Sequence, residues 1–280
     1  MAVHFCTIAS GSSGNCIFVG SDSTRILIDA GLSGKRIENG LTSVGINPNS
    51  LDALFVTHEH SDHIQGIGIL SRRFDLPVYA TPGTWQAMDA YNALGKIHPR
   101  NKLLVYSDER IVLNDLCINP FSIPHDAAEP VGYAIESEGR KIAVATDIGK
   151  PTPLIEHNIS DCDVLLIESN HDLDMLENGP YPIQLKRRIR GDFGHLSNVA
   201  AGQLITCVYS PRLVAVILGH LSEENNRPAI AFDTVRNILH ENGIDTSADT
   251  RLVVADRHHP GRLISLRTHD LTDASPAIGM

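Results

Sequence analysis

The stretch HEHSDH, residues 58–63, contains three histidines and two acids and follows an apolar run. On an extended chain His58, His60 and Asp62 point the same way, because side chains alternate with a period of two, and His63 falls where the chain turns into a helix. Neutral imidazoles and carboxylates are natural ligands for Zn²⁺, Mn²⁺ or Fe. These groups are too many for one tetrahedral ion, so the stretch predicts a site for two metals.

Four other residues of metal-ligand type stand at the ends of apolar runs. They are Asp29 in RILIDAG, His125 in SIPHDA, Asp147 in AVATDIG and His220 in VILGHLS. Taken alone, an aspartate at a strand end is commonly a turn residue or a helix cap. Each of the four is therefore a weak signal by itself.

The HxHxDH motif and the order of these residues resemble the metallo-β-lactamase superfamily. The resemblance implies two ligand sets, His58, His60 and His125 for one metal and Asp62, His63 and His220 for the other. It also implies that Asp147 bridges the metals and that Asp29 holds a ligand in place. Zn²⁺ is the favoured ion, with Mn²⁺ or Fe as alternatives.

Two neighbouring ions lower the pKa of a shared water, which makes hydroxide available at pH 7, and they stabilise charge on substrate oxygens. We therefore expect a hydrolase that uses metal-bound hydroxide, with Asp62 among its catalytic residues. Such a site fits lactams, thioesters and phosphodiesters alike, and a fold does not decide between them.

Two further segments, LLIESNHD and GDFGHLSNVAAGQL, favour phosphodiesters. They resemble ribonuclease Z and its relatives, in which a Glu is followed by a Gly-His-Ser-type segment. The resemblance implies that His195 is the general acid for a leaving alkoxide and that Glu168 stabilises its protonated form. The alternative is a histidine at a helix start that bonds only to backbone. We also expect His171 to line the site.

Candidate substrate contacts come from two segments. In IASGSSGNCIFV small residues let backbone N–H groups face outward and accept a phosphate, so Ser12, Ser13 and Asn15 are candidates, although a plain hairpin turn is the alternative. LKRRIR is the densest basic cluster of the chain. Lys186 and Arg187 are candidates to follow a nucleic-acid backbone, and a solvated helix face is the alternative.

Together with HDAAEPVGY and YPIQLKRRI, these segments resemble the YycJ/WalJ-like group of the superfamily over nearly the whole chain. The resemblance implies a DNA exonuclease that acts from 5′ ends, with nucleic acid as its partner. One alternative is a small-molecule hydrolase of a cyclic phosphodiester or a thioester on the same dinuclear site. Another is a non-hydrolytic diiron redox or sensor module, in which the Glu168–His195 pair has no role.

The elements that carry these residues read as β-strands followed by helices, twice over. Helical spacing covers 33–46, 64–75 and 223–243. This order favours an α/β protein of two packed mixed sheets with helices outside, an αββα sandwich. Periodicity alone does not exclude a doubly wound parallel sheet. We expect one domain over 1–267 and a loose tail over 268–280.

Composition restricts the partners. The chain has 280 residues and a formal net charge of −10, which argues against generic nucleic-acid binding through a basic surface. A nucleic-acid substrate stays compatible, because metal ions and a local basic patch supply positive charge. No apolar run approaches the roughly 18–20 residues of a membrane span. With no signal-type N-terminus and five scattered cysteines, we expect a cytoplasmic protein without a membrane partner. The oligomeric state stays open.

Overall fold

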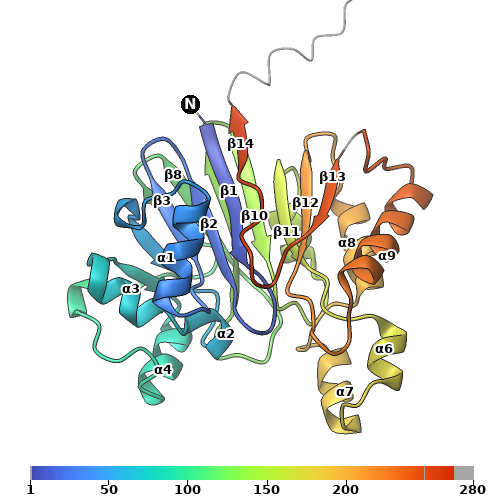
Figure 1. Cartoon of the computed structure of the whole chain (residues 1–280), viewed down its shortest axis with the longest axis horizontal. Helices are drawn as coiled ribbons and strands as arrows, with labels where there is room; N and C mark the ends of the chain where they lie inside the picture. Colours follow the sequence, from blue (N-terminus) through green and yellow to red (C-terminus); the bar gives the residue numbers. More distant parts are fainter. Residues whose placement is uncertain (1, 249, 268–280) are drawn as a thin grey trace, which may run out of the picture.

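The computed structural model describes residues 2–248 and 250–267, whose strands pair into two seven-stranded sheets (Figure 1). The first sheet has the order β14-β1-β2-β3-β4-β5-β6 and the second β13-β12-β11-β10-β9-β8-β7. The strands of the first sheet are β1 (Ala2–Ala9), β2 (Cys16–Gly20), β3 (Arg25–Ile28), β4 (Ala53–Phe55), β5 (Val78–Ala80), β6 (Lys102–Leu104) and β14 (Ile264–Arg267). Those of the second are β7 (Ile111–Leu113), β8 (Leu116–Ser122), β9 (Val131–Ser137), β10 (Arg140–Ala145), β11 (Val164–Glu168), β12 (Ala215–Gly219) and β13 (Arg251–Val254).

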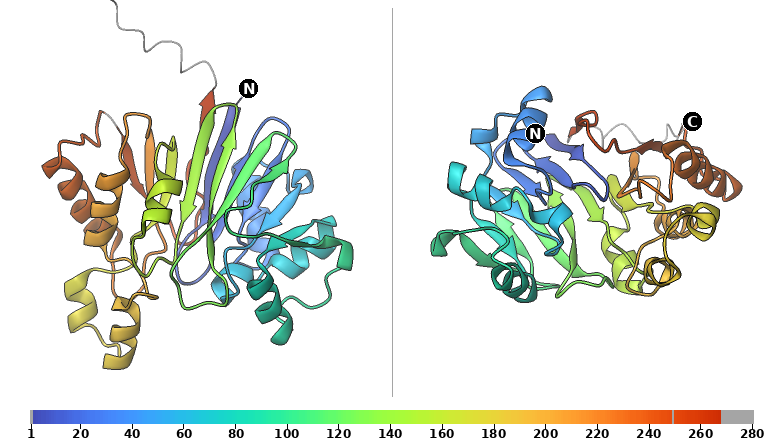
Figure 2. Two further views of the ribbon diagram at one scale, coloured as in Figure 1. Left: turned by 180° about the vertical axis from the view of Figure 1, so that it is seen from behind. Right: turned by 60° about the horizontal axis from the view of Figure 1, so that its bottom comes forward.

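Helices cover the outer face of each sheet. Beside the first sheet lie α1 (Gly34–Ser43), α2 (Ser61–Ile64), α3 (Ile67–Phe74) and α4 (Pro82–Ala90), and beside the second lie α5 (Pro153–Ile159), α8 (Asn198–Val208) and α9 (Pro228–Glu241). Two short helices, α6 (Leu173–Asn178) and α7 (Ile183–Arg190), project together at one end of the molecule (Figure 2). No helix within the described ranges is long and apolar enough to cross a membrane.

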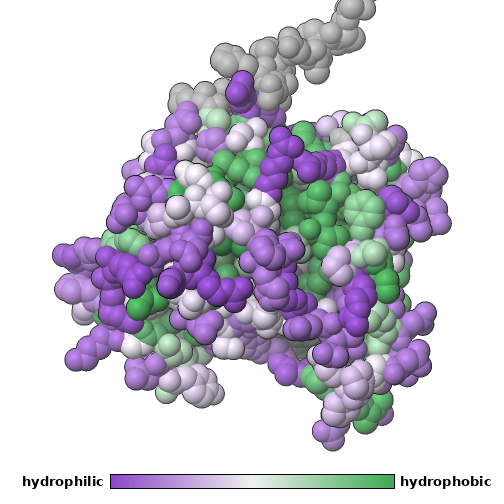
Figure 3. All heavy atoms as spheres, in the orientation of Figure 1, coloured by the Kyte–Doolittle hydropathy of each residue, from purple (hydrophilic) through white to green (hydrophobic). Residues whose placement is uncertain are grey.

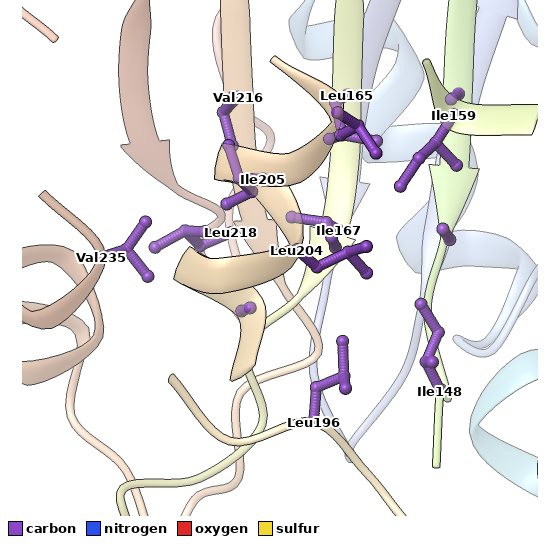
Figure 4. Packing of buried hydrophobic residues seen from close by; sticks show 14 of the residues in the cluster. Ile148, Ile159, Leu165, Ile167, Leu196, Leu204, Ile205, Val216, Leu218 and Val235 are labelled. Atoms are coloured by element: carbon purple, nitrogen blue, oxygen red, sulfur yellow. The ribbon is translucent and has the colours of Figure 1, made fainter. Parts of the chain in front are cut away.

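Three apolar clusters hold these four layers together. The buried strand β11 illustrates the alternation that produces them. Its residues Val164 and Leu166 face the cluster between the sheets, whereas Leu165 and Ile167 face the cluster under α8 and α9. Figure 4 shows Leu204 of α8 beside Ile167 in that second cluster. The third cluster packs α1, α3 and α4 on the first sheet. The predicted αββα sandwich is confirmed.

Each sheet is antiparallel on one side and parallel on the other. Strands β3 to β6 pair in parallel in the first sheet, and β10 to β13 do so in the second. The parallel strands β11 and β12 are buried along their whole length, as expected for strands covered on both faces. Because parallel strands run in one direction, the residues after β3, β4, β10, β11 and β12 gather at one edge of the sandwich.

The two sheets separate at one side of the sandwich, where β1 and β14 of the first sheet face β12 and β13 of the second. A cavity of about 220 Å³ lies there, with Phe5, Ile217 and Val253 among its lining residues. Figure 3 shows the apolar surface that this opening leaves beside β14. The inner core of the sandwich therefore reaches solvent on this side.

Four elements differ from the sequence-based expectation. The helix expected over 64–75 begins only at Ile67 as α3, because the backbone N–H of Gly66 donates to Ala30 O at 2.7 Å instead of continuing α2, which ends at Ile64. The helix expected over 223–243 begins only at Pro228, a residue that favours the first helical position. The short strand β7 and the helix α6 were not predicted. Residues 268–280, the expected tail, lie outside the described residues.

Candidate metal centre

The loop after β4 brings its histidines against a residue that follows β8. His58 Nε2 lies 2.9 Å from His60 Nδ1, which lies 3.4 Å from His125 Nε2. Two nitrogen ligands of one tetrahedral Zn²⁺, each at about 2.0–2.1 Å, are separated by about 3.3–3.4 Å. The backbone carbonyl of Gly194 accepts the Nδ1–H of His125 at 3.2 Å, which turns Nε2 of that ring toward the other two. The three rings are therefore arranged as ligands of one cation.

A second group of potential ligands adjoins the first. Asp62 Oδ2 lies 3.5 Å from His63 Nε2 and 3.4 Å from His220 Nε2. The ligand atoms of these three residues all lie within 4.8 Å of one another, as do those of the first group. His63 and His220 are buried, and Asp62 is partly exposed. This group matches the second ligand set expected from the sequence.

Asp147 lies between the two groups. Its Oδ2 is 3.4 Å from His63 Nε2, and its Oδ1 is 3.4 Å from His220 Nδ1 and 3.7 Å from His125 Nε2. Oδ2 is buried and has no hydrogen-bond partner among the described residues. A buried carboxylate oxygen without a partner is costly, whereas a cation on either side would compensate its charge. The residues present therefore fit a centre for two divalent ions.

On the first-sheet side, Asp29 supports this centre through hydrogen bonds to His63 and to the neighbouring Thr57. Its Oδ2 accepts the Nδ1–H of His63 at 2.7 Å, and the hydroxyl of Thr57 donates to the same oxygen at 2.8 Å. The backbone N–H of Thr57 donates to Oδ1, also at 2.8 Å. Asp29 thus fixes the orientation of the His63 ring without contacting the space between the ligands. Thr57, which the sequence analysis did not single out, completes this support.

On the second-sheet side, Glu168 is fully buried and serves four donors. Its Oε1 accepts from His195 Nδ1 and from His220 Nδ1, each at 2.8 Å. Its Oε2 accepts the backbone N–H groups of Ile148 at 3.0 Å and Leu196 at 2.9 Å. The structure therefore brings His195 and Glu168 together as expected, and it adds a link to His220 that the sequence did not reveal.

Three of these residues adopt a left-handed backbone just after a strand. The φ angles are 60° at Asp29, 60° at Asp147 and 54° at His220. Such angles are uncommon outside glycine and cost roughly 1–3 kcal/mol each. Each turns the chain sharply at the end of β3, β10 or β12 and so directs its side chain into the site.

The acids of the site raise the pKa of two of the candidate ligand histidines. Burial alone would lower the pKa of His63, but Asp147, Asp29 and Asp62 raise it well above its usual value. Burial opposes the same effect at His220, where Asp147, Asp62 and Glu168 raise the pKa to about 10. The carboxylates thus stabilise positive charge within the site. Divalent cations can supply this charge in place of the protons on His63 and His220.

A cavity of about 250 Å³ opens onto the centre, and the predicted substrate contacts differ in how they meet it. Ser12 and His195 line the cavity, as do His60, His125 and His220. Ser13 is exposed and lines an adjacent cavity. The lining also includes Tyr181 and Arg188 of the segment that carries α7, together with Asp126, whose carboxylate pairs with Arg188.

Asn15 and His171 are buried rather than turned to solvent. The Asn15 amide lies 3.1 Å from His63 Nε2, so it packs under the metal ligands instead of facing a phosphate. A Cβ at Gly31 would lie 1.6 Å from Asp62 O, so only glycine admits the close approach of the loops around Asn15. His171 is buried, does not line the cavity, and burial lowers its pKa to about 4.

Lys186 and Arg187 do not line the cavity, whereas Arg188 on the same helix does. Lys186 Nζ donates to Glu177 O at 2.6 Å. Ile189 is the buried residue of α7, so its packing sets which side of the helix faces the site. The density of basic residues in the sequence correctly indicated a helix next to the cavity. Which of its basic residues line the cavity depends on how the helix is rotated about its axis.

Two mixed sheets packed face to face, with a His/Asp centre at their strand ends, define a metallo-β-lactamase fold. A family model described as a beta-lactamase superfamily domain matches residues 24–216. The crystal structure of the metallo-β-lactamase fold protein YhfI from Bacillus subtilis shares this fold with a TM-score of 0.68, at 14% sequence identity, over 93% of this chain and 99% of that one.

Two curated relatives are much closer in sequence. Exodeoxyribonuclease YycJ of Bacillus anthracis is 40% identical over 243 residues, which cover 87% of this chain and 91% of that protein. Exodeoxyribonuclease WalJ of Streptococcus pneumoniae is 36% identical over 245 residues, covering 88% and 91%. The chain therefore belongs to the metallo-β-lactamase superfamily of metal-dependent hydrolases and, within it, to the family of YycJ and WalJ. The resemblance noted in the sequence is confirmed.

Proposed function

We propose that the protein is a metal-dependent exonuclease that hydrolyses the phosphodiester bonds of DNA. The observation that carries this proposal is the hydrogen bond between His195 and Glu168 beside the ligand cluster. Cleavage of a phosphodiester expels an alkoxide, which needs a proton, and an acid–base pair at the cavity wall meets that need. The names of the relatives YycJ and WalJ, both exodeoxyribonucleases, support the same choice.

Two divalent ions would be held by the two ligand groups, His58, His60 and His125 on one side and Asp62, His63 and His220 on the other, with Asp147 between them. Zn²⁺ is favoured over Mn²⁺ because imidazoles outnumber carboxylates, and Fe is compatible with the same donors. When bound, such ions polarise phosphate oxygens and lower the pKa of water. Asp29 keeps His63 aligned through its bond to Nδ1.

His195 acts as the general acid in this proposal. Its Nδ1–H is held by Glu168, so Nε2 carries the proton that the leaving oxygen receives. Burial alone would lower the pKa of His195, but Glu168 and Asp147 raise it above its usual value and so favour the protonated ring. A thioester releases a thiolate, which needs no such donor. The pair therefore favours phosphodiester cleavage over a thioesterase on the same centre.

The setting of the site fits this substrate. Arg188 places one positive charge on the cavity wall of an otherwise acidic protein.

We further propose that residues 1–267 form one domain, since the cluster between the sheets contains residues from Val3 to Leu266. A cytoplasmic location is supported by the cysteines, all five of which are free.

The proposal is tested by digesting 5′- and 3′-end-labelled DNA and RNA with purified protein in added Zn²⁺ or Mn²⁺. The variant Asp62→Ala, which lacks one ligand, serves as the contamination control. Stepwise loss from one end of DNA, absent in the variant, is expected and reveals the polarity. Absence of cleavage of every polymer by metal-loaded protein would refute the nuclease assignment and favour a small phosphodiester or thioester.

A further inference from the structure

A second cavity adjoins the one that holds the candidate metal centre. It has a volume of about 490 Å³, and Ser12 and Asp62 belong to the walls of both cavities. The second cavity extends away from His195, along α4 and the turn that follows it. A substrate strand with its phosphate at the ligands can therefore continue from one cavity into the other.

The walls of the second cavity suit a nucleobase better than a phosphate. Tyr91 lines it with 83% of its surface exposed, and Met88 and Gln65 are also among its lining residues. None of its lining residues is a lysine or an arginine. The acids in the wall are Glu59, whose Oε1 accepts the N–H of Ala128, and the candidate ligand Asp62. An exposed aromatic ring in a wall that has polar groups but no cation is better suited to stacking a base than to binding a phosphate.

The backbone at Tyr91 is fixed although its ring is exposed. Tyr91 caps the end of α4, where its N–H donates to Ala87 O at 3.3 Å. The next residue, Asn92, has a left-handed backbone with φ 49° and ends the helix. The backbone that carries the ring is thus fixed beside the cavity, which lowers the entropy cost of stacking a base on the ring.

We propose that the second cavity is a nucleobase subsite, in which the base next to the scissile phosphate stacks on Tyr91. This inference rests on the proposed function and adds a binding site for the part of the DNA strand that leaves the candidate metal centre. Because every base has an aromatic face, the subsite grips single-stranded DNA without reading its sequence. Stacking on Tyr91 would also help an acidic protein to bind DNA, because salt does not screen a stacking contact between uncharged rings.

The test compares Tyr91→Ala and Tyr91→Phe with Tyr106→Ala, which changes a tyrosine that is 42% exposed and lines neither cavity. Each variant is assayed on end-labelled single-stranded DNA and on bis-p-nitrophenyl phosphate, whose rings are bound directly to the phosphate oxygens, without the sugar that places a base away from the phosphate. Tyr91→Ala should raise KM for DNA roughly 5- to 150-fold. The fold increase in KM for DNA should be at least about five times the fold increase in KM for the small diester. Tyr91→Phe, which keeps the ring, should stay close to the wild type.

Abasic substrates identify the base that stacks. Two oligonucleotides each lack the base on one side of the scissile bond, and one of them should abolish the difference between Tyr91→Ala and the wild type. The inference is overturned if Tyr91→Ala behaves like Tyr106→Ala on DNA, or if its effect survives in both abasic substrates. A wild-type enzyme that cleaves the small diester but no DNA would instead refute the proposed function, and the subsite with it.

Discussion

Each sheet contributes one buried carboxylate that supports the metal ligands, and the two carboxylates differ in what they hold. Asp29, after β3, accepts from His63 and twice from Thr57, so its partners all lie in the loop that follows β4. Glu168, at the end of β11, accepts from residues of three separate segments. One of them, His195, lies outside both proposed ligand groups. In the proposed function, the first sheet therefore supports metal binding alone, whereas the second couples metal binding to proton transfer.

The largest effect is expected for Glu168→Ala, because it releases His195 and His220 together. Loss of an acid typically costs 10²–10⁴-fold, and loss of support for a ligand costs 10–100-fold, so activity on DNA should fall at least about 10³-fold. The free energy of unfolding should fall as well, by roughly 1–3 kcal/mol for each buried N–H left unpaired. Turnover, bound metal and thermal unfolding are measured together.

The matched variant is Asp29→Ala, which removes the corresponding carboxylate of the first sheet. Its activity should recover when excess metal is supplied, since it leaves the acid intact. If Asp29→Ala stays as inactive as Glu168→Ala in saturating metal, the distinction between the two sheets is wrong.

The next effect isolates proton transfer. His195→Ala should reduce kcat/KM on DNA roughly 10²–10⁴-fold. It should reduce activity on bis-p-nitrophenyl phosphate far less, because nitrophenolate leaves without a proton. Metal content, measured by mass spectrometry, should stay at the wild-type level, since His195 is not among the proposed ligands. Equal losses on both substrates would show that His195 is not the acid.

The pH profile tests whether Glu168 acts through His195. Burial alone would lower the pKa of His195, and the Glu168 carboxylate is the main group that raises it. Glu168→Gln removes this charge, so the ring should lose its proton at a lower pH. The descending limb of kcat/KM on DNA should therefore move to lower pH. A limb that stays in place would mean that another group titrates there.

A smaller effect is expected for Asp29→Asn on the first-sheet side. The amide keeps the size of the side chain but no longer attracts the Nδ1–H of His63 as strongly. Metal affinity should fall roughly 10–100-fold, which is typical for the loss of a partner behind a ligand. Competition with a chelator measures this affinity. The ratio of activities on DNA and on the nitrophenyl ester should not change in saturating metal, and a changed ratio would contradict the assignment.

Sequence reasoning was most effective where function depends on local spacing. The motif over 58–63 needs only the alternation of an extended chain to align its side chains. The strand-end residues Asp147 and His220 are weak signals alone, and they were identified by the family resemblance, which places them in the expected order. His195 and Glu168 depended on a family resemblance, since nothing local joins two residues that meet only after folding.

Other features depend on contacts between distant segments and could not be inferred. Whether Arg188 or Lys186 faces the cavity depends on how α7 packs through Ile189. The burial of Asn15 requires that its turn be pressed against the loop of Asp62, which a pattern of small residues does not indicate. The Glu168–His220 bond likewise joins two strand ends far apart in sequence.

The smallest effect concerns the arginines on the two sides. Arg188, beside the second sheet, lines the cavity and pairs with Asp126, whereas Arg73, beside the first sheet, pairs with Glu38 and lines neither cavity. Arg188→Ala should raise KM for DNA a few-fold and reduce the slope of log KM against log salt by about 0.7, the value for one phosphate contact on a single strand. Arg73→Ala should change neither quantity. If both variants alter the slope equally, positive charge contributes by its sum over the surface, and the second sheet has no special part in guiding the strand.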